Sequence, residues 1–313
     1  MNPIETILAR QSIMILDGAF GTELERKGYD INDELWSAKF LMYNPEAIAS
    51  VHLDYLRAGA DCITSASYQA SFEGFMKKGL SEVEAKKLIH SSITIAQKVR
   101  DDFWSDTSLH VKRPKPLVAA SIGPYGAYLA DGSEFRGDYT LDSEALKAFH
   151  TKRLATLIEA KPDLIACETI PCLNEAKALC ALLEAYPTMR AWMSFSAKDG
   201  EHINSGEPIK ECAKWLQTQK QIVAIGINCT APEHITSLIE QIKAVSSKPI
   251  IVYPNGGATY NALSKTWDGL GSHASFGKMA YEWYQKGACI IGGCCQTTPE
   301  DIATIAQFVR GES

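Results

Sequence analysis

The chain has 313 residues, of which 46% are apolar and 22% charged, and its formal net charge is −6. This composition supplies enough apolar material for a sizeable core, and the negative balance speaks against a nucleic acid partner. No basic region precedes an apolar stretch at the start, and no run of about eighteen apolar residues occurs. We therefore expect a cytoplasmic protein without a membrane-spanning segment.

The nine cysteines are an odd number scattered along the chain, unlike the dense, even framework of a small secreted domain. Reduced thiols fit this pattern better. Cys62, Cys167 and Cys289 lie in apolar runs, and Cys180 and Cys212 lie in helical stretches. Because a free cysteine packs like a small apolar side chain, we expect these five to have no special role.

Short apolar runs recur along the chain. They are nearly continuous rather than alternating, which is typical of strands covered on both faces of a parallel sheet. Eight strands are predicted, at Ile13–Asp17, Ala60–Ser67, Leu117–Ile122, Asp163–Glu168, Ala191–Ser196, Ile222–Asn228, Pro249–Tyr253 and Ala288–Gly292.

Segments with helical spacing separate these strands. The predicted helices include Pro45–Ala58, Ser81–Arg100, Ser143–Ala160, Asn174–Tyr186, Pro208–Gln219, Pro232–Val245 and Ala274–Lys286. Asn44, Thr230 and Thr298 each precede a proline and acidic residues, which predicts three N-caps.

Eight β/α units favour an α/β fold of the (β/α)8 TIM barrel type, as a single domain over residues 1–313. An open doubly wound sheet is the alternative. No Gly-x-Gly-x-x-Gly follows the first strand, which counts against the dinucleotide-binding form of that alternative.

Polar and metal-binding groups stand where the predicted strands end. In a barrel these ends share one face, and catalytic residues gather there. The groups are Asp17 at the end of the first strand, Ser67 at the end of the second, Glu168 at the end of the fourth, Cys229 after the sixth, Asn255 after the seventh, and Cys294 with Cys295 after the eighth. We expect them to converge.

Cys229, Cys294 and Cys295 suit a zinc site, because thiolate is a soft ligand and a catalytic zinc takes three protein ligands and keeps one position open. Only the fold can join Cys229 to the distant pair. Adjacent cysteines on an extended segment point to opposite faces, so joint ligation needs a turn, for which Gly292 and Gly293 supply backbone freedom. A vicinal disulfide and two unrelated buried thiols remain alternatives.

Three segments together resemble the zinc-dependent homocysteine S-methyltransferase family: Leu16-Asp17-Gly18-Ala19-Phe20-Gly21-Thr22-Glu23-Leu24, Gly226-Ile227-Asn228-Cys229 and Gly292-Gly293-Cys294-Cys295. They span the chain and occur in family order. The resemblance implies a (β/α)8 barrel with one Zn²⁺ held by Cys229, Cys294 and Cys295, whose open position binds the thiol of L-homocysteine.

The long loop over Gly123–Tyr139 is similar to that of stand-alone members that use S-methylmethionine as methyl donor. S-adenosylmethionine is a second methylsulfonium donor to consider. Cobalamin-dependent relatives need additional modules for which this chain has no room. The long C-terminal oligomerisation extension of betaine-using relatives is missing, and we therefore expect a monomer.

The resemblance also implies substrate contacts. It places Asp17 and Glu168 at the homocysteine ammonium, and the backbone N–H groups of Gly18 and Ala19 at its carboxylate. From the residues alone, two acids at strand ends also fit a proton-transfer site, and Asp17 also fits a helix cap.

Weaker candidates surround this set. Ser67 and Asn255 either contact the substrate and metal or satisfy loop backbone groups. The aromatic residues of the long loop either line a lid facing the sulfonium or anchor the loop to the barrel; they are Tyr125, Tyr128, Phe135 and Tyr139. Trp36 is a further candidate for stacking nearby.

Three thiolates would give zinc a formal charge of about −1, which makes it a weak Lewis acid for water but keeps a bound substrate thiolate nucleophilic. This favours alkyl transfer to sulfur, by in-line displacement and with no catalytic group beyond the metal centre. The alternatives are a zinc-dependent hydrolase and a non-catalytic or redox-sensing thiol barrel.

Overall fold

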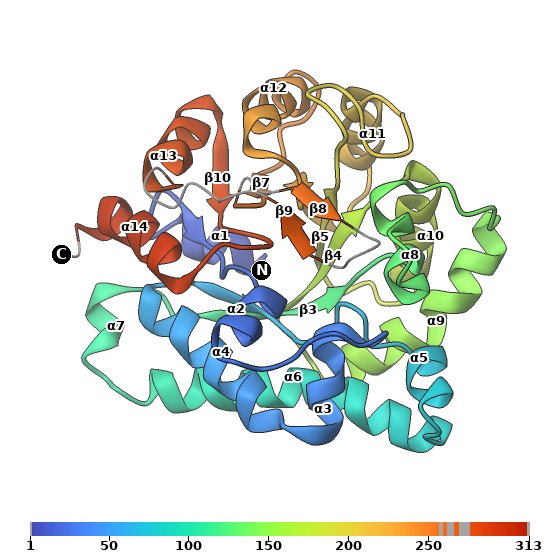
Figure 1. The fold of residues 1–313 in the computed structure, drawn as a ribbon. Coiled ribbons are helices and arrows are strands. Elements are labelled where there is room, and N and C mark those ends of the chain that lie inside the picture. The colour runs from blue at the N-terminus through green and yellow to red at the C-terminus, as the bar shows by residue number, and fades with distance from the viewer. Residues whose placement is uncertain (1, 257–258, 262–265, 269–275, 312–313) are drawn as a thin grey trace.

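The computed structural model describes residues 2–256, 259–261, 266–268 and 276–311. Among these residues, eight parallel strands form one sheet in the order β1-β10-β7-β6-β5-β4-β3-β2, and helices surround it (Figure 1). A parallel bridge between Leu16 and Cys62 links the two outermost strands, so the sheet nearly closes. The structure confirms the predicted TIM barrel and excludes the open doubly wound sheet.

All eight predicted strands are present, though several are shorter than expected. They are β1 (Met14–Ile15), β2 (Cys62–Thr64), β3 (Leu117–Ile122), β4 (Leu164–Ile170), β5 (Ala191–Phe195), β6 (Ile222–Asn228), β7 (Ile250–Tyr253) and β10 (Ala288–Ile291). An antiparallel pair, β8 (Thr259–Asn261) and β9 (Thr266–Asp268), lies between β7 and β10 in the chain.

Long helices form the outer layer (Figure 1). They are α4 (Pro45–Ala58), α6 (Glu82–Trp104), α9 (Ser143–Glu159), α10 (Leu173–Leu183), α11 (Ile209–Gln217), α12 (Pro232–Lys243), α13 (Phe276–Lys286) and α14 (Pro299–Arg310). Short helical segments fill the connections: α1 (Pro3–Leu8), α2 (Gly21–Arg26), η1 (Trp36–Lys39), α3 (Phe40–Tyr43), α5 (Phe72–Lys77), α7 (Leu109–Lys112), α8 (Tyr125–Leu129) and η2 (Ser133–Phe135). None of the described helices is both long and apolar enough to cross a bilayer.

Two of the three predicted N-caps are confirmed. The Asn44 side chain accepts a hydrogen bond from an N–H in the first turn of α4, and Thr298 forms a capping box with Asp301 at α14. The third prediction was wrong, because the N-cap of α12 is Ala231. The Thr230 hydroxyl instead donates to the carbonyl of Asn228 at 2.9 Å and so stabilises the turn that follows β6.

Two apolar clusters hold the barrel together. The larger lies between the strands and the outer helices, and the smaller fills the barrel interior. Ile4 and Ile7 of α1 belong to the interior cluster, as does Trp192 of β5. The Trp192 indole N–H donates to the Tyr253 hydroxyl at 2.9 Å, so its one polar atom is satisfied. The filled interior leaves the C-terminal ends of the strands as the open face.

Candidate active site

A cleft enclosing about 160 Å³ opens at the C-terminal ends of the barrel strands. Its described lining includes Asp17, Gly18, Ala19, Trp36, Thr64, Tyr68, Gln69, Glu134, Phe135, Glu168, Thr169, Asn228, Cys229, Cys294 and Cys295. Asp17, Glu25, Asp33, Glu134 and Glu168 are all acidic, whereas no Lys, Arg or His occurs in the described lining. A concave surface lined with one sign of charge attracts ligands of the opposite sign, so this cleft suits cations.

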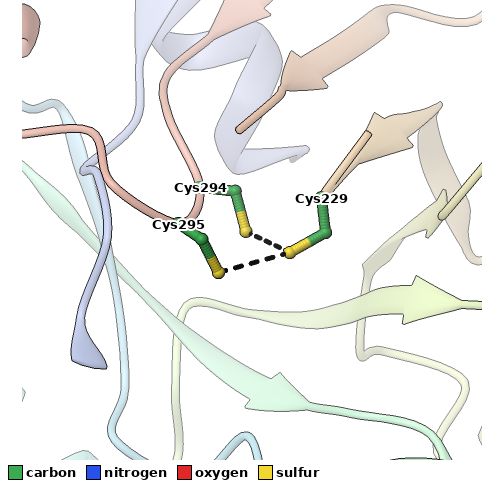
Figure 2. A group of neighbouring side chains, drawn as sticks. All are labelled: Cys229, Cys294 and Cys295. Carbon is green, nitrogen blue, oxygen red and sulfur yellow. Dashed lines mark hydrogen bonds between the residues drawn. The ribbon is translucent and has the colours of Figure 1, made fainter. Parts of the chain in front are cut away.

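The three predicted cysteines meet in the cleft. Cys229 follows β6, while Cys294 and Cys295 follow β10, and their side chains point toward one another (Figure 2). The Sγ atom of Cys229 lies 2.6 Å from that of Cys294 and 3.7 Å from that of Cys295. All three sulfurs lie within 4.8 Å of one another, and no other group of three His, Cys, Asp or Glu residues in the described chain is so placed.

The loop after β10 presents both adjacent cysteines because its backbone is held from several sides. The N–H of Cys294 donates to the Pro254 carbonyl, and the carbonyl of Cys295 accepts from Gly256, each at 2.8 Å. The glycines are needed for close approach: a Cβ on Gly293 would lie 2.1 Å from the Thr297 hydroxyl. Left-handed backbone occurs in this loop at Gln296, where φ is 68°, and not at the two glycines.

Left-handed backbone also occurs at Thr169 (φ 57°) and Cys229 (φ 47°), which both line the cleft. Such conformations cost about 1–3 kcal/mol each and persist where surrounding contacts impose them. Asn228 supplies these contacts for Thr169, because its side chain accepts from the Thr169 N–H and donates to the Thr169 hydroxyl, each at 2.7 Å. The sequence did not predict the left-handed turn at Thr169 or its support by Asn228, although Asn228 and Cys229 stand together at a predicted strand end.

The crowded sulfurs perturb one another. Hydrogen bonds from Cys229 and Cys295 hold the pKa of the Cys294 thiol well below its usual value. The pKa of the Cys229 thiol is raised well above its usual value, because it donates a hydrogen bond to Cys294 and is buried with it. Neighbouring like charges disfavour one another, so joint ionisation of the three thiols needs a cation.

The donor set fits a thiophilic metal ion. Two sulfurs that are each about 2.3 Å from a tetrahedral zinc lie about 3.8 Å apart, which matches the 3.7 Å between Cys229 and Cys295. The 2.6 Å between Cys229 and Cys294 is shorter than this and longer than a disulfide bond. Coordination by all three would require that pair to separate by about 1 Å, which one side-chain rotation provides.

Asp17 and Glu168 are buried in the cleft without a basic partner in the described lining. Asp17 accepts hydrogen bonds from the Thr64 N–H, at 2.7 Å, and the Thr64 hydroxyl, while Ser121 donates to Glu168. Burial raises the pKa of Asp17 to about 7 and that of Glu168 to about 8. The charge of Asp17 contributes to the shift at Glu168, so the two carboxyl groups act on a common region.

Of the other predicted substrate contacts, some line the cleft and others lie outside it. Gly18 and Ala19 line the cleft, but the Ala19 N–H already donates to the Thr297 hydroxyl at 3.1 Å. Ser67 is fully buried outside the lining, where its hydroxyl donates to the Ser121 carbonyl at 2.7 Å. It is displaced because β2 ends at Thr64, three residues earlier than expected.

Asn255 is buried and also lies outside the lining. Its backbone N–H donates to the Thr230 carbonyl at 3.0 Å, and its side-chain oxygen has no partner among the described residues. Asn255 therefore links the loop after β7 to Thr230, which is next to Cys229 in the chain.

One aromatic residue of the long loop lines the cleft and three do not. The first is Phe135, and Trp36 of η1 lines the cleft as well. Tyr125 and Tyr128 pack on Phe149 of α9, and the Tyr139 hydroxyl donates to buried Glu175. For these tyrosines the structure supports the anchoring alternative.

A family model described as Homocysteine S-methyltransferase matches residues 14–309. The chain is similar to the homocysteine S-methyltransferase YbgG of Bacillus subtilis, with 56% identity over 99% of this chain and 98% of the relative. It is 48% identical to the Escherichia coli homocysteine S-methyltransferase over 97% of each chain.

Solved structures agree with these matches. The metallated form of the homocysteine methyltransferase MmuM from Escherichia coli superposes with a TM-score of 0.88 and 45% identity, over 97% of this chain and 99% of that chain. The oxidized form of MmuM gives a TM-score of 0.89 over 98% and 100% of the two chains.

Proposed function

The chain belongs to the homocysteine S-methyltransferase family and transfers a methyl group to homocysteine, and on that basis we propose that its methyl donor is a methylsulfonium compound and its metal is zinc. S-methylmethionine is the proposed donor, and S-adenosylmethionine is the second candidate. The proposed zinc ligands are Cys229, Cys294 and Cys295. The hydrolase and redox-sensor alternatives are not favoured by these relatives.

The charge of the cleft is the main support for a sulfonium donor. Its described lining contains five carboxyl groups, three thiols and no basic side chain. A methylsulfonium is cationic and is attracted to such a site, whereas a reduced folate carries carboxylates and is repelled. The charge of the lining thus supports a cationic donor.

Zinc, when bound, would supply the positive charge that keeps the homocysteine sulfur deprotonated at neutral pH. The choice of zinc rests on the three-cysteine donor set, on the 3.7 Å sulfur separation and on the metallated form of the E. coli relative.

Asp17 and Glu168 are proposed to hold the homocysteine ammonium. Both are buried and lack a cationic partner, so an ammonium group between them would restore their ionised forms. The N–H of Gly18 is proposed to face the carboxylate of the substrate, while that of Ala19 is already paired with Thr297. These contacts fix the direction in which the substrate sulfur points.

The reaction is an in-line displacement. The homocysteine sulfur forms a bond to the methyl carbon, the bond from that carbon to the donor sulfur breaks, and a neutral thioether leaves with the electron pair. An anion and a cation neutralise each other in this transition state, so alignment in a partly dry cleft accelerates the step more than proton transfer would.

The same proposal covers the assembly. We propose a cytoplasmic monomer in which residues 1–313 form one catalytic domain. All nine cysteines, each in the described part of the chain, are free thiols, which supports a reducing compartment.

A donor comparison tests this proposal. Initial rates of methionine formation are measured with S-methylmethionine, S-adenosylmethionine and a reduced methylfolate at equal homocysteine. Transfer from a sulfonium with none from the folate is the expected result. Transfer from the folate alone would refute the donor assignment.

A further inference from the structure

Gln69, a residue of the cleft lining, has an unused hydrogen-bond acceptor. It lies after β2, is only 8% exposed, and its side-chain nitrogen donates to the Ala127 carbonyl at 2.9 Å. Because that carbonyl is only an acceptor, the amide nitrogen must face it and the amide oxygen must point elsewhere. The oxygen, Oε1, is buried and has no hydrogen-bond partner among the described residues.

Glu134 presents a second unused acceptor from the long loop after β3. Its Oε2 atom is buried, and it also lacks a partner in the described part of the chain. Burial raises the pKa of this carboxyl group to about 7, and Asp131 adds to the shift, whereas a hydrogen bond from its own backbone N–H and the charge of Arg136 oppose it. A buried acceptor atom without a donor is costly, which indicates that a ligand completes Oε2.

The two acceptors lie on the same wall of the cleft. Gln69 is bonded to Ala127 of α8, and the preceding residue, Gly126, is so close to Glu134 that a Cβ there would lie 2.4 Å from the Glu134 nitrogen. Both side chains line the cleft, together with Tyr68. Burial raises the pKa of the Tyr68 phenol, and Glu134 and Cys229 both add to that shift, so this phenol lies within reach of the acid and of the sulfurs.

We propose that Glu134 and Gln69 bind the α-ammonium group of the methyl donor. This rests on the proposed function, since it assumes a sulfonium donor built on an amino acid. Two unpaired oxygen acceptors call for N–H donors, and a sulfonium has none, whereas the ammonium of S-methylmethionine or S-adenosylmethionine has three. The cleft would then hold two ammonium groups, one at Asp17 and Glu168 and one at Glu134 and Gln69.

This assignment makes Glu134 a specificity residue for the donor and leaves homocysteine binding to other groups. Glu134→Gln keeps the shape of the side chain and removes its charge. We expect the KM for S-methylmethionine to rise about tenfold or more, while the KM for homocysteine changes less than about twofold. Glu211→Gln, which neutralises an exposed acid of α11 outside the cleft lining, is the matched control and should change neither value more than about twofold.

A sulfonium compound without the ammonium group shows whether Glu134→Gln weakens only ammonium binding or disturbs the whole loop. Dimethylsulfoniopropionate has the sulfonium and the carboxylate but no α-ammonium, and its inhibition constant against S-methylmethionine is measured with both enzymes. We expect that constant to change less than about twofold in Glu134→Gln.

Two results would overturn the inference: an unchanged KM for S-methylmethionine, or an equal loss of affinity for both sulfonium compounds. Absence of transfer from any sulfonium by the unmodified enzyme is a different outcome, because it would refute the proposed donor class itself.

Discussion

Among single residues, Asp17 and Glu168 are the two proposed to bind the ammonium group of homocysteine. In the ligand-free protein, burial raises both pKa values, to about 7 and about 8. A carboxyl group whose folded pKa is raised favours the fold below its unfolded value near pH 4, and this contribution is lost as the pH rises through 7 to 8. An ammonium ligand reverses that loss by pairing with the ionised forms.

The affinity of methionine should therefore rise with pH. Methionine has the same ammonium and carboxylate as homocysteine but no titrating thiol, so among the groups proposed to hold its ammonium only Asp17, Glu168 and Glu134 titrate between pH 6 and 8.5. We expect a gain of up to about tenfold per pH unit for each proton released, measured by calorimetry. The dependence should weaken in the double variant Asp17→Asn/Glu168→Gln and vanish when Glu134→Gln is added; an unchanged dependence in the double variant would show that other groups bind the ammonium.

Cys294→Ala removes one sulfur from the centre at the rim of the cleft. Transfer activity should fall by about 10³-fold or more, since several kcal/mol of charge stabilisation depend on the metal. Far-UV circular dichroism should show an intact barrel. Cys289→Ala, which removes a thiol of β10 outside the centre, should keep activity within about twofold; unfolding of Cys294→Ala would instead indicate a structural metal.

The sequence predicted that the three cysteines and the two acids converge at the strand ends, because each stands at or shortly after the end of an apolar run. It did not predict that Asn228 holds Thr169 in a left-handed turn, since neither residue type indicates such a turn. It misplaced Ser67, because the length of a strand within an apolar run depends on where its neighbour stops pairing.

At the scale of elements, the approach of β6 to β7 brings Cys229 beside the loop that carries Pro254 and Asn255. Gly226 permits this approach, because an added Cβ would lie 1.7 Å from the carbonyl oxygen of Ile251. That oxygen belongs to a paired strand and cannot move alone. The glycine is thus a requirement of the barrel interior and not of a turn.

Gly226→Ala should therefore destabilise the barrel by about 3 kcal/mol or more, as overpacking against backbone does. Chemical denaturation measures the change. Gly200→Ala is the control, since a Cβ there meets only Ser237 at 3.3 Å, and should cost less than about 1 kcal/mol. Equal stabilities of the two variants would contradict the tight packing of β6 on β7.

Strands and long helices were predictable from their periodicity, but the short connecting segments were not. Segments of four to six residues, such as α5 and α8, are too brief to show a period of 3.6. The predicted Thr230 cap was wrong because its hydroxyl donates to the Asn228 carbonyl at the end of β6 and accepts from the Ala197 N–H after β5, which local sequence does not reveal.

At the scale of the whole molecule, the barrel separates stability from chemistry. Apolar side chains and α1 fill the interior toward the N-terminal ends of the strands, while acids and thiols occupy the opposite face. The fold and family were evident from the order of motifs. The concentration of acids in the described lining was not, because Asp17, Glu25 and Asp33 follow β1, Glu134 follows β3 and Glu168 lies in β4, and only the closed barrel brings them together.

The proposed enzyme transfers methyl from a sulfonium donor to homocysteine at a zinc centre of three cysteines. To test this, the enzyme is given deuterium-labelled homocysteine and unlabelled S-methylmethionine, and both methionine products are counted by mass spectrometry. The zinc-loaded enzyme should form labelled and unlabelled methionine in equal amounts, chelation should stop the reaction, and about one zinc per chain should restore it. Undiminished transfer by the metal-free enzyme would show that the reaction does not need zinc.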